Sequence, residues 1–196
     1  EYGGDDVITV GDGINHILGG MGSDRITTGS GTDIILGDNG IILYDGPTGA
    51  LQPQLITSTL PTSGGSDTIL TGNGNQDVIG GIGNDTVTTG SGNDIILGDN
   101  GLIEFDTGGL PSLVHDLNPS DGGSDTITSG SGSDILIGGA GSDDAFGGAG
   151  NDALIGDGGQ VTLTGGNWLY IETTNINVGG GDDFLDSGPG NDVLFG

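Results

Sequence analysis

The sequence lacks several features on which most folded proteins depend. It has no cysteine and no lysine, and its one basic residue, Arg25, stands against 28 acidic residues. Hydrophobic residues make up 31% and aromatic residues 4% of the 196, whereas an average soluble domain is roughly 45–50% apolar. The missing cysteines exclude a disulfide framework. The missing basic patch argues against a nucleic-acid partner, and no apolar run reaches the ~18 residues that membrane insertion requires.

Glycine and negative charge are present in excess. The chain has 47 glycines and a formal net charge of −27. Low hydrophobicity with high net charge is typical of disordered chains, and glycine loses the most backbone entropy when it is ordered. A compact state would also repel itself unless cations bind to it. The chain is therefore either disordered or held together by something other than a large apolar core, and cations are its expected partners.

A nine-residue repeat runs through the chain. The frame starts at Glu1, holds for five units to Asp45, and restarts at Thr62, Ser120 and Val178. The stretches between, 46–61, 107–119 and 165–177, do not fit the frame, and we interpret them as inserts. A fixed period of this kind predicts a solenoid. We predict one continuous domain over 1–196, in blocks 1–61, 62–119 and 120–177 with the start of a fourth at 178–196, and we expect it to be a piece of a longer protein.

Three positions of the unit carry the pattern. Position 4 is glycine in all 17 units, position 8 is apolar throughout, and position 6 is aspartate in 12 of the 14 units that are not fifth in their block. Positions 6 and 8 point to the same face of an extended segment, so position 8 predicts a thin core between two sheets. The glycine-rich half predicts a turn with positive φ angles. Stacked turns would bring the aspartates into a column.

A column of carboxylates requires bound cations. Calcium takes six to eight oxygen ligands from carboxylates and carbonyls, whereas magnesium demands a stricter octahedron. Zinc prefers nitrogen or sulfur, and the two histidines, His16 and His115, are not spaced as a pair. Calcium is therefore the expected ion.

The unit resembles the repeat of a known family. The segments GGMGSDRIT (19–27), GGIGNDTVT (80–88) and GGAGNDALI (147–155) match GGxGxDxUx, the nonapeptide of the repeats-in-toxin (RTX) family. The resemblance implies an all-β, right-handed parallel β-roll (a β-solenoid) with two units per coil. It also implies calcium held between stacked turns by carbonyls and position-6 aspartates, export by a type I system, and folding on meeting extracellular calcium.

Carried over residue by residue, the resemblance gives the calcium ligands, on the order of ten ions sharing ligands from stacked turns. The position-6 aspartates are Asp6, Asp24, Asp33, Asp67, Asp85, Asp94, Asp125, Asp134, Asp143, Asp152, Asp183 and Asp192. Asn15 and Gln76 depart from the pattern; each still offers a carbonyl oxygen, so those sites are expected to be weaker or lost.

The fifth units depart further. They carry an apolar residue at position 6 and an aspartate at position 2, namely Asp38, Asp99 and Asp157. These aspartates either cap a calcium column or are ordinary Asp-Gly turn residues.

The fourth units predict a role for the inserts. Ile34 and Leu36, and likewise Ile95 and Leu97, are apolar at positions that should point outward. A strand that is apolar on both faces should be covered on both. We predict that each insert, running on from the fifth unit, forms a hairpin-like arm against this outer face. Five is an odd number of units, so an insert could instead supply a missing half-coil.

The leading functional hypothesis is a calcium-binding structural segment of a large secreted or surface protein, of the adhesin, surface-layer or filament type. Folding would be coupled to binding of extracellular calcium, and open solenoid ends would allow the chain to assemble with itself. The alternative is the C-terminal RTX module of a secreted enzyme whose catalytic domain lies elsewhere. No HExxH or GxSxG motif occurs, so we expect no catalytic residue. Trp168 and Tyr170 could form a sugar-binding platform, although aromatics more often serve burial.

Overall fold

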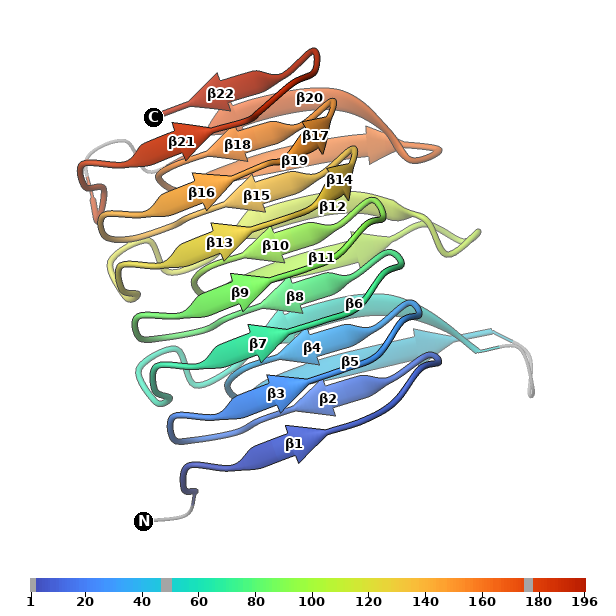
Figure 1. Cartoon of the computed structure of the whole chain (residues 1–196), viewed down its shortest axis with the longest axis vertical. Helices are drawn as coiled ribbons and strands as arrows, with labels where there is room; N and C mark the ends of the chain where they lie inside the picture. The colour runs from blue at the N-terminus through green and yellow to red at the C-terminus, as the bar shows by residue number, and fades with distance from the viewer. Residues whose placement is uncertain (1–2, 47–50, 175–177) are drawn as a thin grey trace.

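The computed structural model describes residues 3–46, 51–174 and 178–196. Over these residues the chain forms β-strands and no helix, and so no helix that could cross a membrane. The strands stack as the rungs of a parallel β-roll, with a further sheet behind it (Figure 1). This confirms the predicted all-β fold class.

Two parallel sheets form the roll. Sheet A takes one strand from each first and third unit, and sheet B one from each second and fourth unit. Sheet A consists of β1 (Val7–Thr9), β3 (Arg25–Thr27), β7 (Thr68–Leu70), β9 (Thr86–Thr88), β13 (Thr126–Thr128), β16 (Asp144–Phe146) and β21 (Phe184–Asp186). Sheet B consists of β2 (His16–Leu18), β4 (Ile34–Leu36), β8 (Asp77–Ile79), β10 (Ile95–Leu97), β15 (Ile135–Ile137), β18 (Ala153–Ile155) and β22 (Val193–Phe195).

The stacking of the roll continues across the inserts. Strand β3 pairs in parallel with β7, with Ile26 opposite Ile69, although an insert separates them in the sequence. Strand β4 pairs with β8 in the same way, with Ile35 opposite Val78. Because the repeat positions stay in register, every position forms its own column along the roll. A minor sheet of β14 (Ser131–Gly132) and β17 (Ala149–Gly150) lies in one of the turns.

Position 8 fills the inside of the roll. Its side chains from both sheets form one buried cluster, which contains Ile17, Ile26, Ile35, Ile69, Val78, Val87, Ile96, Ile127, Leu136, Ala145 and Leu154. One inward side chain per strand gives the thin core that the repeat predicts.

The fifth units leave the roll with their inserts. Each fifth unit forms an antiparallel hairpin with the insert that follows, and the hairpins pair with one another into sheet C, which lies behind the roll (Figure 1). Its strands, in chain order, are β5 (Gly40–Asp45), β6 (Gln52–Ser58), β11 (Gly101–Phe105), β12 (Pro111–Asp116), β19 (Gly159–Thr164) and β20 (Asn167–Thr173). The hairpin arm is therefore confirmed. The half-coil alternative is wrong, because the roll takes four units from each block and none from the insert.

Sheet C creates a second core against the outer face of sheet B. The apolar residues that replace aspartate at position 6 of the fifth units explain this packing, since Ile103 and Val161 are fully buried. They share a cluster with Ile34, Leu36 and Ile95 from sheet B. The prediction that the inserts cover the outer face of the fourth units is therefore confirmed. The chain has three layers. Of the position-8 residues in fifth units, Leu163 belongs to the outer core and Phe105 packs against it, whereas Tyr44 is exposed.

Candidate calcium sites

Two columns of position-6 side chains run along the roll, one in each row of turns. Column A lies in the turns that lead into sheet A and contains Asp6, Asp24, Asp67, Asp85, Asp125, Asp143 and Asp183. Column B lies in the turns that lead into sheet B and contains Asn15, Asp33, Gln76, Asp94, Asp134, Asp152 and Asp192. The structure thus brings together all fourteen predicted position-6 residues, in two separate rows.

One oxygen of each side chain joins neighbouring coils. In column A, the backbone N–H of each position-6 residue donates to the Oδ1 atom of the next member, at 2.7–3.0 Å. Column B has the same ladder at 2.8–3.0 Å. A hydrogen bond of this kind contributes about 1 kcal/mol to stability. The aspartates therefore stabilise the stack even before an ion is considered, a role that the sequence pattern did not reveal.

The second oxygen of most column aspartates is buried without a hydrogen-bond partner among the described residues. These unpartnered Oδ2 atoms belong to Asp24, Asp33, Asp67, Asp85, Asp125, Asp134, Asp143, Asp152 and Asp183. Buried polar atoms in native proteins are nearly always paired, and an uncompensated buried charge is costly. A row of such atoms is what a line of bound cations would satisfy.

Backbone carbonyls converge on the same points in column A. A Cβ atom placed on Gly98 would lie 2.2 Å from Asp125 Oδ2 and 2.7 Å from the carbonyl oxygen of Gly138. The position-1 glycines Gly19, Gly37, Gly80 and Gly138 face the same kind of pair, so a larger residue is excluded at each. Among the described residues, no three side chains of His, Cys, Asp or Glu gather around one point. An ion in column A would therefore need carbonyl as well as carboxylate oxygens, which is the donor set of calcium.

The buried carboxylates in the middle of column A are difficult to ionise without a cation. Burial, reinforced by the neighbouring carboxylate of Asp125, raises the pKa of Asp85 to about 9. Burial, reinforced by Asp143, likewise raises the pKa of Asp125 to about 8. Burial raises the pKa of Asp67 to about 7, and Asp38 and Asp24 act in the same direction. At neutral pH these groups favour a bound positive charge, whether a proton or a metal ion.

Column B is interrupted by two amides. The Nε2 atom of Gln76 donates to the carbonyl oxygens of Gly31 and Gly74, at 2.9 and 3.1 Å, while its Oε1 atom accepts the backbone N–H of Asp33 at 3.0 Å. Asn15 donates in the same way, to Gly11 O at 3.1 Å. At both positions the amide nitrogen provides the positive partner for the turn carbonyls.

Column B also has side chains where column A has glycine. Thr89 stands at position 1 and its hydroxyl donates to Asp94 Oδ2 at 2.6 Å. Ser129, at the same repeat position, donates to the carbonyl of Gly147 at 2.7 Å. Hydroxyls and amides thus satisfy part of column B internally, and column A is the more open of the two to cations.

The position-2 aspartates lie beside column A. Both oxygens of Asp38 accept backbone N–H groups, from Gly65 at 3.1 Å and Ile82 at 2.7 Å. Asp99 accepts from Gly123 and Ala140 in the same way. These bonds join one block to the next, which fits the turn interpretation. Burial raises the pKa of Asp99 to about 10, and the nearby Asp125 and Asp143 act in the same direction.

Asp157 accepts from Gly181 N at 3.1 Å. It also raises the pKa of Asp183 in column A, after the larger effect of burial.

Position 4 must be glycine because the coils touch there. A Cβ atom on Gly74 would lie 1.9 Å from the carbonyl oxygen of Gly31 in the coil below, and its φ of 123° is rare for other residues. The same close approach recurs at Gly92, 2.1 Å from Gly74 O. The invariant glycine is therefore a stacking requirement as well as a turn requirement.

Comparison with known protein families agrees with this geometry. The model of the RTX calcium-binding nonapeptide repeat matches residues 2–40, 70–101, 120–154, 146–167 and 174–196, which together cover more than half of the chain. The chain belongs to this family, whose repeats bind calcium. A search of curated proteins finds no match.

Proposed function

We propose that the chain is a calcium-locked structural segment of a secreted or surface protein, with the position-6 aspartates of both columns as the principal ligands. The observation that carries the proposal is the row of buried Oδ2 atoms without hydrogen-bond partners, five of which face a glycine carbonyl in column A. Calcium would supply the positive charge and the coordination that these oxygens lack.

The charge of the chain makes folding depend on that binding. A net charge of −27 opposes compaction, and the free energy of ion binding is available to offset it. The two apolar cores between the three sheets also stabilise the fold. The ions are therefore required chiefly to stabilise the turns, where the carboxylates gather. Because extracellular fluids are richer in calcium than the cytosol, the chain would stay unfolded during export, by a type I system, and fold outside the cell.

The architecture favours a length-building role, as in an adhesin, a surface-layer protein or a filament. Each block adds two coils to the roll and one hairpin to sheet C, and both sheets of the roll and sheet C continue without a break from block to block. Such an array extends by simple repetition. We propose no catalytic role for this segment; a secreted enzyme carrying it as a folding module is the other candidate, and catalytic motifs elsewhere in the parent protein would favour it.

Calcium-binding calorimetry tests the ligand assignment. The variant Asp125→Asn keeps an acceptor for the N–H of Asp85 but removes the charge at Oδ2, whereas Asp144→Asn removes an equal charge from the exposed neighbour of Asp143. We expect Asp125→Asn to lower the number of bound ions or their affinity, and Asp144→Asn to leave both unchanged. Equal effects of the two variants would contradict the proposal.

A further inference from the structure

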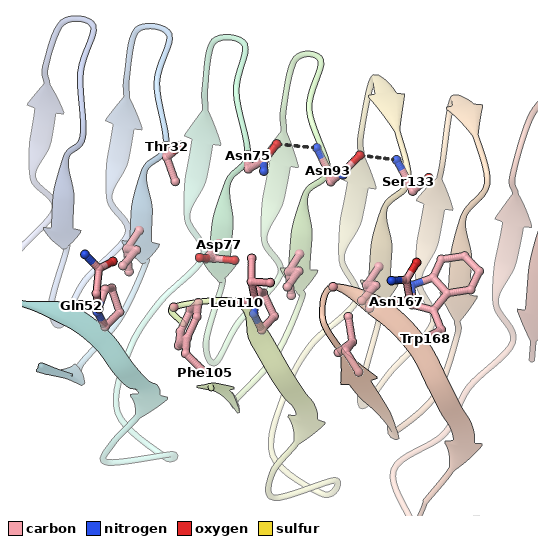
Figure 2. Close-up of a pocket in the computed structure, with 18 of the residues that line it drawn as sticks. Thr32, Gln52, Asn75, Asp77, Asn93, Phe105, Leu110, Ser133, Asn167 and Trp168 are labelled. Atoms are coloured by element: carbon pink, nitrogen blue, oxygen red, sulfur yellow. Dashed lines mark hydrogen bonds between the residues drawn. The ribbon is translucent and has the colours of Figure 1, made fainter. Parts of the chain in front are cut away.

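A groove of about 840 Å³ runs between the outer edge of sheet B and the tips of the sheet C hairpins. Its lining includes residues from every block, from Ile14 and Tyr44 to Trp168 and Asn191. Figure 2 shows Asn75, Asn93 and Ser133 in a row on one side, and Phe105, Leu110 and Trp168 reaching in from the hairpins on the other. The groove borders column B, since rim residues such as Asn93 directly precede candidate ligands such as Asp94, but calcium does not use it in the function proposed above.

One rim of the groove is a row of polar side chains at repeat position 5. Asn75 Oδ1 accepts the backbone N–H of Asn93 at 2.9 Å, and Asn93 Oδ1 accepts that of Ser133 at 2.9 Å. These bonds fix the amide planes, and the NH₂ groups of Asn75 and Asn93 are left exposed at the groove. Side chains held in advance lose less entropy on binding a ligand. The rim therefore presents a polar side chain in each coil after the first, where position 5 is Ile14.

The opposite side repeats once per block. Each hairpin has a β-bulge just before position 8 of its fifth unit, between Leu43 and Tyr44, Glu104 and Phe105, and Thr162 and Leu163. The cross-strand pairs that follow are Tyr44 with Pro53, Phe105 with Pro111, and Leu163 with Trp168, and all six residues line the groove. Bulges commonly re-aim side chains next to binding sites. Each block thus contributes one aromatic ring to the groove.

The floor is a row of position-7 side chains from sheet B. In successive coils that line the groove these are His16, Ile34, Asp77, Ile95 and Ile135, so Asp77 is a carboxylate placed between isoleucines. The polar Asp77 interrupts the packing of its isoleucine neighbours, so its presence requires a reason other than packing (Figure 2).

The spacing indicates the shape of the ligand. Polar rim side chains recur at each coil after the first, ~4.8 Å apart, and aromatic rings at every second coil, ~10 Å apart. An extended peptide advances by ~3.4 Å per residue and a polyproline helix by ~3.1 Å, so the rise per residue of neither matches the ~4.8 Å spacing of the rim side chains. A hexopyranose chain linked across its rings advances by about one strand spacing per ring. The strands of sheet B run across the groove, and their backbone groups are paired with the neighbouring strands. A peptide in the groove would therefore meet no free strand edge to which it could add a strand.

The chemistry of the groove lining also favours a sugar chain over a peptide. Besides the phenol of Tyr44, the ionisable residues among the described lining residues are His16 and Asp77, in a chain of net charge −27. An acidic polymer would be repelled by the surrounding protein. Sugar hydroxyls both donate and accept hydrogen bonds, which suits amide donors on the rim and a carboxylate acceptor on the floor. The apolar faces of sugar rings suit the aromatic side chains.

We propose that this groove binds an extended neutral polysaccharide along the axis of the roll, stacked on Tyr44, Phe105 and Trp168 and held by the position-5 side chains. Rings would stack at every second position, and the polar position-5 side chains, such as Asn75, Asn93 and Ser133, would bind the hydroxyls of the rings beside them. Asp77 would accept a hydroxyl at the floor.

The fluorescence of Trp168, the one tryptophan in the chain, reports on the groove directly. The probes are neutral hexasaccharides, β-1,4-glucan, β-1,4-mannan and β-1,3-glucan, added to the full chain in saturating calcium. We expect a saturable fluorescence change with at least one of them, and affinity that rises at least about tenfold from disaccharide to hexasaccharide, since longer chains reach more rings.

Variants separate binding from folding. Phe105→Leu keeps an apolar side chain and removes the flat ring, and we expect about tenfold weaker binding. Tyr170→Ala removes an exposed aromatic of β20 outside the groove lining, and should leave the affinity within about twofold. Asp77→Ile supplies the residue found in the neighbouring coils, and should weaken sugar binding while raising the melting temperature. Circular dichroism in calcium checks that each variant is folded.

Three results would overturn the proposal. The first is the absence of a saturable change with every hexasaccharide. The second is an equal loss of affinity in Tyr170→Ala and Phe105→Leu. The third is saturable binding of a proline-rich peptide in place of any sugar. All three are read on calcium-saturated, folded protein, so they are distinct from a failure of calcium-coupled folding.

Discussion

Replacing Gln76 by aspartate tests whether a side-chain amide stands in for calcium in column B. The variant Gln76→Asp restores the family residue at position 6 and can still accept the N–H of Asp33. It loses the two bonds that Nε2 donates, to Gly31 O at 2.9 Å and Gly74 O at 3.1 Å. Each such bond contributes about 1 kcal/mol, so at low calcium the variant should be less stable by about 2 kcal/mol or more.

Calcium should reverse that loss. If the new carboxylate completes an ion site, one additional ion binds the folded state and contributes about 2.7 kcal/mol at a calcium concentration of 100 times its Kd. The stability of the variant should therefore rise more steeply with calcium than that of the parent, by about 1.4 kcal/mol per tenfold increase. The two stability curves should cross at high calcium.

Urea unfolding at a series of calcium concentrations measures both quantities. Asn75→Asp is the matched control, because it introduces the same charge one residue away on the exposed side of the turn. We expect its calcium dependence to equal that of the parent. An unchanged slope for Gln76→Asp, with lower stability at every calcium concentration, would refute the idea that the amide occupies the place of a cation.

Three further predictions follow from the packing. Gly98→Ala places a methyl group 2.2 Å from Asp125 Oδ2 and should raise the calcium concentration needed for folding by at least about tenfold, whereas Gly11→Ala, with nothing within 4 Å, should change it little in the same titration. Ile103→Ala opens a cavity between sheets B and C, and thermal unfolding in calcium should show that the free energy of unfolding falls by ~2–5 kcal/mol. A decrease below about 1 kcal/mol would contradict a tightly packed outer core. Asp116 is buried at the base of its hairpin with a pKa that burial raises to about 7, from 3.8. Its ionisation therefore destabilises the fold progressively as the pH rises from about 4 to 7, and Asp116→Ser, the residue found at the equivalent Ser58, should stabilise the chain more at pH 8 than at pH 5. An equal effect at both pH values would contradict the buried charge.

The periodic features of the fold could be predicted from the sequence because each repeat position keeps one environment in every coil. Position 8 predicted the inner core, and the apolar outer positions of the fourth units, such as Ile34 and Leu36, predicted a covering layer. The sequence left open whether the fifth unit leaves the roll with its insert or forms a coil with it, since five is an odd number of units. Ile103 and Val161 at position 6 were the signal that the fifth unit leaves the roll. An apolar residue at this position cannot join a carboxylate column, and both residues are buried between sheets B and C.

The different roles of the two carboxylate oxygens of each column aspartate could not be predicted from the sequence. The pattern placed a carboxylate at position 6, but only the coordinates separate an Oδ1 that binds the next coil from an Oδ2 that has no partner. The roles of Gln76 and Asn15 depend on the orientation of an amide, which spacing does not specify. Glycine at position 1 was a usable signal, because it recurs in the third and fifth units and excludes a side chain beside Oδ2.

The most direct test of calcium-coupled folding is far-UV circular dichroism of the purified chain during a calcium titration, with magnesium as the control. We predict a cooperative change from coil to β-structure at millimolar or lower calcium, and none at equal magnesium, because calcium accepts irregular carboxylate and carbonyl ligands that magnesium does not. The same folded β spectrum in EDTA as in calcium would contradict this mechanism, since the aspartate columns would then fold without the ion.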